Sequence, residues 1–296
     1  ISGGFTSGEL YTRVVLAWLA SAPSGGLWSN ASNWDGGFIP DGAGAIPTLG
    51  NYDVIADTTV VLDSPRTLSG LIFGDTNTAT TANWIVSNHG NNANTLTLDV
   101  DTGSPTVTVN ALGSGATATL DTVIAGSDGL TKAGMGTLVL GKNNTLGGAL
   151  AVNAGTLRVG GPDGGLTLTA ATNVASGARL EVGGGSLNIS GLVTAVAGAV
   201  VIDSGTANLT GGFRTNSDSN GTLRVNGGTL NVSEINIRRN SAASIDYNSG
   251  FIASGGTTQT GAIWLGNNNS NGAMSVEGGT VEVSGAIMIG NNVGST

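Results

Sequence analysis

Cysteine is absent from this chain of 296 residues, and histidine occurs once, at His89. The absence of cysteine excludes a disulfide framework and thiolate metal sites, and a single histidine provides neither a histidine cluster nor a Cys–His pair. Aromatic residues make up only 4% of the chain, although hydrophobic residues in all make up 39%. Any core therefore has to consist mainly of aliphatic side chains.

Basic residues and long apolar runs are scarce as well. Ten Lys and Arg residues against nineteen Asp and Glu residues give a net charge of −9, which argues against nucleic acid and anionic membranes as partners. No apolar run reaches the roughly 18 residues of a membrane span. We interpret the short apolar run at residues 14–20 as a folded end-piece of the mature chain; a remnant of an export signal ending at Ser21-Ala22 is the alternative.

Glycine, by contrast, is abundant, with 51 residues against 6 prolines and no Gly-X-Y period, so collagen is excluded. Short runs that alternate apolar and variable residues lie between the glycines, a pattern typical of strands with one buried face. GAIWLGNN at residues 261–268 recurs as GAIMIGNN at 285–292, and residues 221–233 align with 272–284 without a gap. The sequence therefore predicts an all-β parallel β-helix with three short strands per coil of about 22–28 residues.

The repeat also predicts the domain organisation and one register. Residues 1–50 are expected to form a non-repetitive N-terminal extension and cap, and residues 51–296 a β-helix of on the order of ten coils, roughly 50 Å long. The two copies of the repeat predict that Ile263 stacks on Ile287, Leu265 on Ile289 and Asn267 on Asn291. We expect the stacked Ile and Leu side chains to be buried, and Trp264 and Met288 to point outward.

Two features of the cap leave alternatives open. The segment at residues 11–20 is expected to cover the first coil, as a short helix or as a strand. Trp28 and Trp34 lie six residues apart in a polar loop. We interpret their indoles as a plug in the blunt end of the solenoid; a carbohydrate-stacking platform is the alternative.

One stretch carries a family resemblance. GLTKAGMGTLVLGKNNT at residues 129–145, GGALAV at 147–152 and GTLRV at 155–159 are similar, nearly position by position, to the repeat of secreted bacterial proteins with autotransporter-associated β-strand repeats. The order Trp28…Asn33-Trp34, Pro40 and LIFG at residues 71–74 resembles the head of the same proteins. Leu146 departs from the repeat, which commonly has an aromatic residue there. The resemblance implies a right-handed β-helix, exported across two membranes, as the stalk of a bacterial cell-surface protein.

No catalytic constellation is visible, so we predict that the chain is not an enzyme and has no catalytic, cofactor-binding or metal site. β-Helices that cleave polysaccharides cluster several Asp with Arg, Lys or His, whereas charged residues here total 10% and the acids are scattered. Asp99 and Asp101 are the one close pair; they could hold a cation, but a solvated strand end is the more common role. His89 is expected in a loop, and Arg238-Arg239 on an outward face.

Two classes of function fit these observations. The first is a non-enzymatic, extracellular structural or adhesive rod on the surface of a bacterium. The second is a carbohydrate-binding or carbohydrate-cleaving β-helix, with Trp28, Trp34 or Trp264 as glycan contacts. The partners expected are further coils of the same chain or identical copies joined head to tail into a filament, and surface glycans. Further coils or a filament are both expected to cover residues 286–290, because these residues have the alternation of a regular strand and nothing that resembles a cap follows them.

Overall fold

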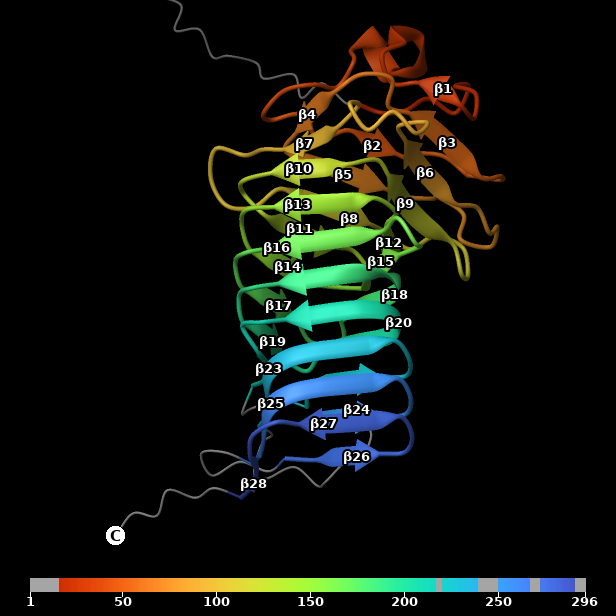
Figure 1. Ribbon diagram of the computed structural model, residues 1–296. Coiled ribbons are helices and arrows are strands. Elements are labelled where there is room, and N and C mark those ends of the chain that lie inside the picture. Colours follow the sequence, from red (N-terminus) through yellow and green to blue (C-terminus); the bar gives the residue numbers. More distant parts are fainter. Residues whose placement is uncertain (1–15, 217–219, 239–249, 267–271, 291–296) are drawn as a thin grey trace, which may run out of the picture.

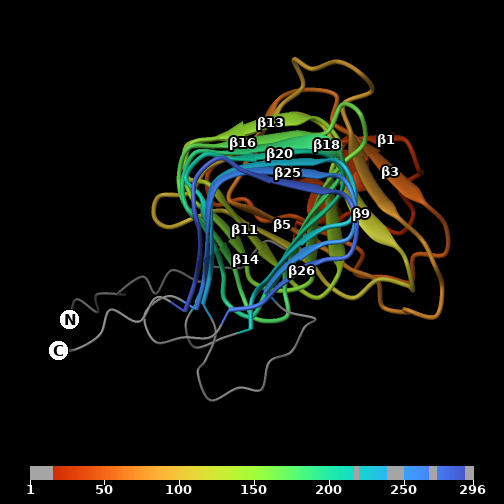
Figure 2. The same ribbon diagram turned by 60° about the horizontal axis from the view of Figure 1, so that its bottom comes forward.

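The computed structural model describes residues 16–216, 220–238, 250–266 and 272–290, which form one stack of coils (Figure 1). Its strands lie on three faces, and neighbouring strands on each face are parallel. Figure 2, which brings the C-terminal end forward, shows the strands of successive coils lying behind one another. The predicted all-β parallel β-helix is therefore confirmed. No helix of the described part is long and apolar enough to cross a membrane.

The first face begins near the N-terminus and contains a strand of every coil. Its strands are β1 (Gly26–Leu27), β3 (Thr58–Val61), β6 (Trp84–Ser87), β9 (Thr117–Asp121), β12 (Thr137–Leu140), β15 (Thr156–Gly160), the first halves of β18 (Arg179–Ile189) and β20 (Ala199–Leu209), β22 (Thr222–Val225), β24 (Gly250–Ala253) and β26 (Met274–Val276).

The second face shares its long strands with both neighbours, because these strands bend around a corner. It consists of β4 (Arg66–Leu68), β7 (Leu96–Leu98), β10 (Ile124–Gly126), β13 (Asn143–Leu146), β16 (Gly165–Leu168), the second halves of β18 and β20, the first halves of β23 (Thr229–Ile237) and β25 (Thr257–Leu265), and β27 (Thr280–Val283).

The third face closes each coil. Its strands are β2 (Thr48–Leu49), β5 (Gly70–Phe73), β8 (Thr106–Val109), β11 (Leu130–Ala133), β14 (Leu150–Val152), β17 (Thr172–Val174), β19 (Val193–Ala195), β21 (Phe213–Thr215), the second halves of β23 and β25, and β28 (Ile287–Ile289).

Coil length varies more than the repeat predicts. Leu138 pairs with Leu157, so that coil advances 19 residues, whereas Trp84 pairs with Ala118, an advance of 34 residues. The expected range of about 22–28 residues is therefore too narrow. The strands keep similar lengths, and the loops between them, such as residues 88–95 and 99–105, absorb the difference.

The predicted register of the last coils is confirmed, but the burial of the last one is not. Ile263 pairs with Ile287 and Leu265 with Ile289, in parallel. Ile263 and Leu265 are buried, whereas Ile287 and Ile289 are 51% and 76% exposed. Their exposure follows because the described part of the chain places no coil beneath β28. Trp264 alternates outward as predicted; the Asn267–Asn291 pair lies outside the described residues.

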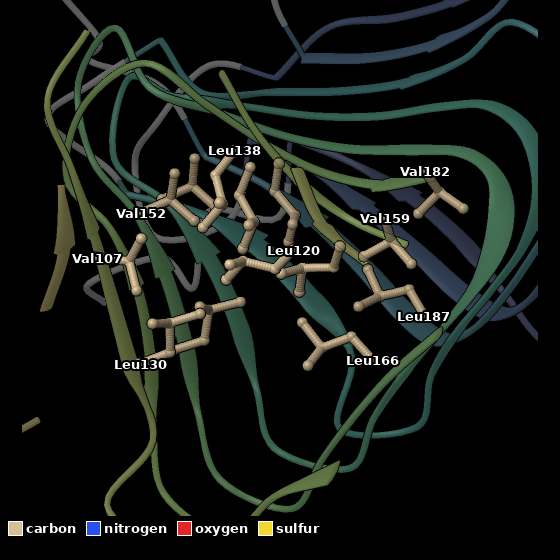
Figure 3. Close-up of a cluster of buried hydrophobic side chains, with 14 of the residues drawn as sticks. Val107, Leu120, Leu130, Leu138, Val152, Val159, Leu166, Val182 and Leu187 are labelled. Atoms are coloured by element: carbon tan, nitrogen blue, oxygen red, sulfur yellow. The ribbon is translucent and has the colours of Figure 1, made fainter. Parts of the chain in front are cut away.

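Aliphatic side chains fill the space between the faces (Figure 3). Leu138 and Val159 point into it from the first face, Leu166 from the second, and Leu130 and Val152 from the third; all five are fully or almost fully buried. Each buried side chain of this size contributes about 1.5–3 kcal/mol to stability. The inward side chains of one coil lie over those of the next, so the core runs along the stack.

Stacked glycines form the corner between the first and second faces. The position where a Cβ of Gly205, Gly228 or Gly256 would lie is 2.2–2.4 Å from the carbonyl oxygen of the glycine one coil earlier. A Cβ has no room there, so this corner requires glycine in successive coils. We call it the glycine column; its members are Gly164, Gly185, Gly205, Gly228, Gly256 and Gly279.

Tryptophans plug the N-terminal end. Trp28 and Trp34 are 0% and 1% exposed, and with Trp18 they form a cluster of edge-to-face rings with centroids 4.8 and 5.0 Å apart. The Trp28 Nε1–H donates to the Pro40 carbonyl, and the Trp34 Nε1–H to the Trp28 carbonyl. The carbohydrate-platform alternative for Trp28 and Trp34 is therefore wrong, because neither indole face is accessible.

The described part of the segment at residues 11–20 forms two isolated β-bridges and ends in a turn. Ala17 forms a parallel bridge with Thr48, and Trp18 an antiparallel bridge with Trp34. Two short 3-10 turns, η1 (Ala31–Asn33) and η2 (Asp35–Gly37), complete the polar loop that holds the indoles. The division at residue 50 stays a prediction, since β1 and β2 already pair with β3 and β5 of the first coils.

Candidate functional site

The acidic pair predicted as a possible cation site lies at the end of β7. Asp99 is half-buried and Asp101 is exposed. The neighbouring Asp128 carboxylate accepts hydrogen bonds from the Val100 N–H, at 3.0 Å, and from the Ser127 hydroxyl, at 2.9 Å, and these bonds lower its pKa. In the described chain no three His, Cys, Asp or Glu residues come together in a way that could hold a metal ion.

The other residues considered from the sequence do not converge on one site. His89 is exposed in a loop after β6, with a left-handed φ of 50°. Arg238 is half-buried and follows β23, while Arg239 lies outside the described residues. Trp264 is half-buried on the outer side of β25, on a different face from His89.

Lys132 is fully buried inside the coil, although a lysine is among the residues least often found there. Its Nζ donates to the carbonyls of Ala133 and Gly134, both at 2.8 Å, and of Ala154 in the next coil, at 3.1 Å. These three acceptors match the three donors of an ammonium group. Burial lowers the pKa of Lys132 to about 8. The side chain thus closes the turn after β11 and ties it to the following coil.

This buried ammonium predicts an unusual pH dependence of stability. The pKa of Lys132 is about 8 when folded and 10.5 for a free lysine side chain, so between these values the unfolded chain binds a proton that the folded chain does not. Raising the pH from about 8 to about 9.5 should therefore stabilise the fold, by about 2 kcal/mol. Urea unfolding followed by circular dichroism measures it, and Lys132→Met should remove the rise. A stability that is flat or falls over this interval in the unaltered chain would contradict the prediction.

Asn144 is the second buried polar residue of the same stretch, 2% exposed. Its Oδ1 accepts the Ile124 N–H at 2.7 Å, and its Nδ2 donates to the carbonyls of Lys142, at 2.6 Å, and Gly165, at 3.1 Å. Ile124 lies one coil before Asn144 and Gly165 one coil after it. One amide therefore fastens three successive coils.

Sequence reasoning missed both residues, although a signal for them was present. Lys132 is two positions from Leu130, and Asn144 two positions from Leu146. Side chains two apart on a strand share a face, so both polar residues fall on the inward side, and the burial patterns of β11 and β13 show this. These two polar residues of the repeat-like stretch therefore hold neighbouring coils together from inside and are not part of the surface.

The described surface carries an axial trough on the second face, with a volume of about 670 Å³. It crosses β20, β23, β25 and β27 (labelled in Figure 1). One rim carries longer polar side chains that stack from coil to coil, and the other carries hydroxyls. The first rim consists of Asn208, Asn231, Gln259 and Glu282, the second of Thr210, Ser233 and Ser284, and the floor of Val232, Thr260 and Val283.

Hydrogen bonds order the amide rim, with one interruption. The Asn208 Nδ2 donates to Asn188 Oδ1, and the Asn231 Nδ2 donates to Asn208 Oδ1, both at 2.7 Å. This series of amide hydrogen bonds stops at Asn231, because the next amide, the Gln259 Nε2, donates to Glu282 Oε2 at 3.0 Å. The Asn231 Oδ1 is consequently left without a donor. Asn231 and Glu282 both lie on the outer side of their strands, and their register creates the trough.

Comparisons with known proteins agree with this architecture. Residues 130–159 match the model of the Passenger-associated-transport-repeat; the match runs from β11 to β15 and contains both Lys132 and Asn144. Over 139 residues, 46% of its length, the chain is 37% identical to the Adhesin BmaC autotransporter of Brucella suis biovar 1 (strain 1330).

The chain spans only 4% of the length of that relative, and no solved structure matches it. Repeat, relative and fold nonetheless agree with the resemblance noted in the sequence. The chain thus carries a passenger-associated transport repeat within a parallel β-helix and is related to an autotransporter adhesin, which indicates a secreted protein of the bacterial cell surface.

Proposed function

We propose that this chain is a section of a non-enzymatic, adhesive rod that projects from the bacterial surface. The observation that carries the proposal is the similarity to an adhesin over 46% of the chain. The structure supports it, because the described coils form one continuous stack whose interior is packed with side chains, so that the outward columns of residues are left for contacts.

Adhesion of the purified chain tests this function. Beads coated with the chain should bind cultured mammalian cells at least tenfold more than beads coated with albumin, and excess soluble chain should compete. Binding no better than that of albumin beads would contradict the proposal. Incubation with neutral and acidic polysaccharides should release no reducing ends; turnover that Asp99→Ala abolishes would instead favour the carbohydrate-cleaving alternative.

The exposed end of the last described coil bears on assembly. Ile287 and Ile289 present apolar surface there, and β28 has a neighbour on one side only among the described strands. We propose that a further coil of a longer parent chain covers this end, because the adhesin relative is far longer than this chain. Joining of copies head to tail into a filament is the other way to cover it.

Sedimentation velocity distinguishes the two arrangements. A series of oligomers that grows with concentration and is abolished by Ile289→Glu would support the filament. A monomer at all concentrations would support the further coil, since isolated sections would then lack affinity for one another.

A further inference from the structure

We propose that the axial trough on the second face binds a neutral glycan chain. The inference rests on the adhesive function proposed above, and it assigns the contact surface to the trough instead of to the tryptophans. Trp28 and Trp34 are buried in the N-terminal plug, and Trp264 lies on the third face, away from the trough.

The dimensions of the trough suit an extended polymer. Its volume of about 670 Å³ falls within the range of ligand sites. It runs along the stack over four strands, so equivalent positions recur at the strand spacing of about 4.8 Å. A chain of sugar units that lies along the axis would meet amides on one side and hydroxyls on the other, coil after coil.

The chemistry of the rims suits hydroxyl groups. Amides and hydroxyls both donate and accept hydrogen bonds, as sugar hydroxyls do. The Asn231 Oδ1 has no donor, and the Gln259 side chain that could supply one is turned towards Glu282. This Oδ1 is buried, so a ligand hydroxyl would donate to it only after displacing the Gln259 side chain. The exposed groups that a sugar would meet first are the Gln259 amide and the Ser233 and Ser284 hydroxyls of the rims, since Val232 and Thr260 on the floor are buried.

Charge and backbone geometry argue against other polymers. Among the described residues that line the trough none is Lys, Arg or His, and Glu282 is acidic, so an anionic glycan would be repelled. A peptide strand would seek free backbone groups, but the floor strands β23 and β25 already pair with neighbours on both sides. The charge of the trough argues against an anionic glycan and the paired backbone argues against a peptide, so we favour a neutral glycan.

Binding of defined oligosaccharides to the purified chain tests the proposal. The probes are the linear hexasaccharides cellohexaose, mannohexaose and xylohexaose, with hexagalacturonate as the anionic comparison, each followed by saturation-transfer NMR and calorimetry. Ser233→Trp fills the trough from its exposed rim and should weaken binding of a neutral probe at least tenfold. Gln259→Ala, which uncovers the buried Asn231 acceptor but removes one rim amide, should change affinity measurably without abolishing the fold.

Thr145→Trp is the matched control. Thr145 is exposed and belongs to the same outward column as Asn208, three coils earlier and outside the trough. Its replacement should leave affinity within twofold. No binding of any neutral probe, stronger binding of hexagalacturonate, or equal loss in both Trp variants would overturn the proposal.

Bead adhesion separates this proposal from the adhesive function. If Ser233→Trp beads adhere as well as unaltered beads, the trough assignment fails and the adhesive function stands. If unaltered beads do not adhere, the adhesive function fails whatever the oligosaccharides show. If Ser233→Trp abolishes adhesion and protease treatment of the cells does so too, while periodate does not, the ligand is a protein and the glycan assignment is wrong.

Discussion

Replacement of Gly228 by alanine should lower the free energy of unfolding by about 4 kcal/mol. Gly228 has a φ of +66°, which an alanine adopts only at a cost. The added Cβ would also lie 2.4 Å from the carbonyl oxygen of Gly205 in the preceding coil. Backbone and not a flexible side chain occupies the space, so two coils of the glycine column would have to move apart. Urea unfolding followed by circular dichroism measures the loss.

Gly161→Ala separates the two causes. Gly161 has a similar φ of +80°, but no atom within 4 Å of where its Cβ would lie. Its replacement should cost only the strain of the left-handed backbone, about 1 kcal/mol. Equal losses at Gly161 and Gly228 would show that the close stacking of the glycine column does not matter to stability.

Asn144→Ala should cost about 3 kcal/mol, because it removes hydrogen bonds within the buried stack. The Ile124 N–H loses its acceptor, and the Gly165 carbonyl loses the Nδ2 donor. The Lys142 carbonyl keeps the Gly165 N–H as a partner. The loss of stability is therefore smaller than if all three groups were left without a hydrogen-bond partner. Hydrogen exchange should show the amide of Ile124 losing protection before the amides of distant coils.

Asn143 provides the comparison for this variant. It is the preceding residue on β13, and its side chain is exposed. Asn143→Ala should change stability by less than about 0.5 kcal/mol. If both variants lower the free energy of unfolding equally, the hydrogen bonds from Asn144 to the neighbouring coils do not contribute to stability.

The alternation of residues predicts much of this fold, because a coil needs little more than inward aliphatic side chains and glycine at its corners. The register of Ile263 on Ile287 follows from the repeat alone. The burial of Lys132 and Asn144 does not follow from the repeat, since polar residues usually face water. Recognising them requires knowing that backbone carbonyls of the adjacent turns point inward and need donors.

The axial trough could not be predicted for a different reason. Asn208 and Asn231 become neighbours only because the intervening coil has a particular length, and coil length varies along the stack. The neighbours of an outward residue on the surface belong to the adjacent coils, and only the strand register determines which residues these are. The sequence therefore predicts that Asn231 faces outward but not what lies beside it.

The parallel stacking also determines how this rod would respond to a pulling force. Hydrogen bonds between coils run along the axis, so a load on the two ends opposes them directly, and the terminal coil would peel away strand by strand. A coil that adds about 4.8 Å to the rod when folded would, once peeled, release roughly 65 Å of chain in the case of the 19 residues between Leu138 and Leu157. Under load the rod would thus lengthen in large, separate steps, each of which absorbs energy while the remaining coils stay folded.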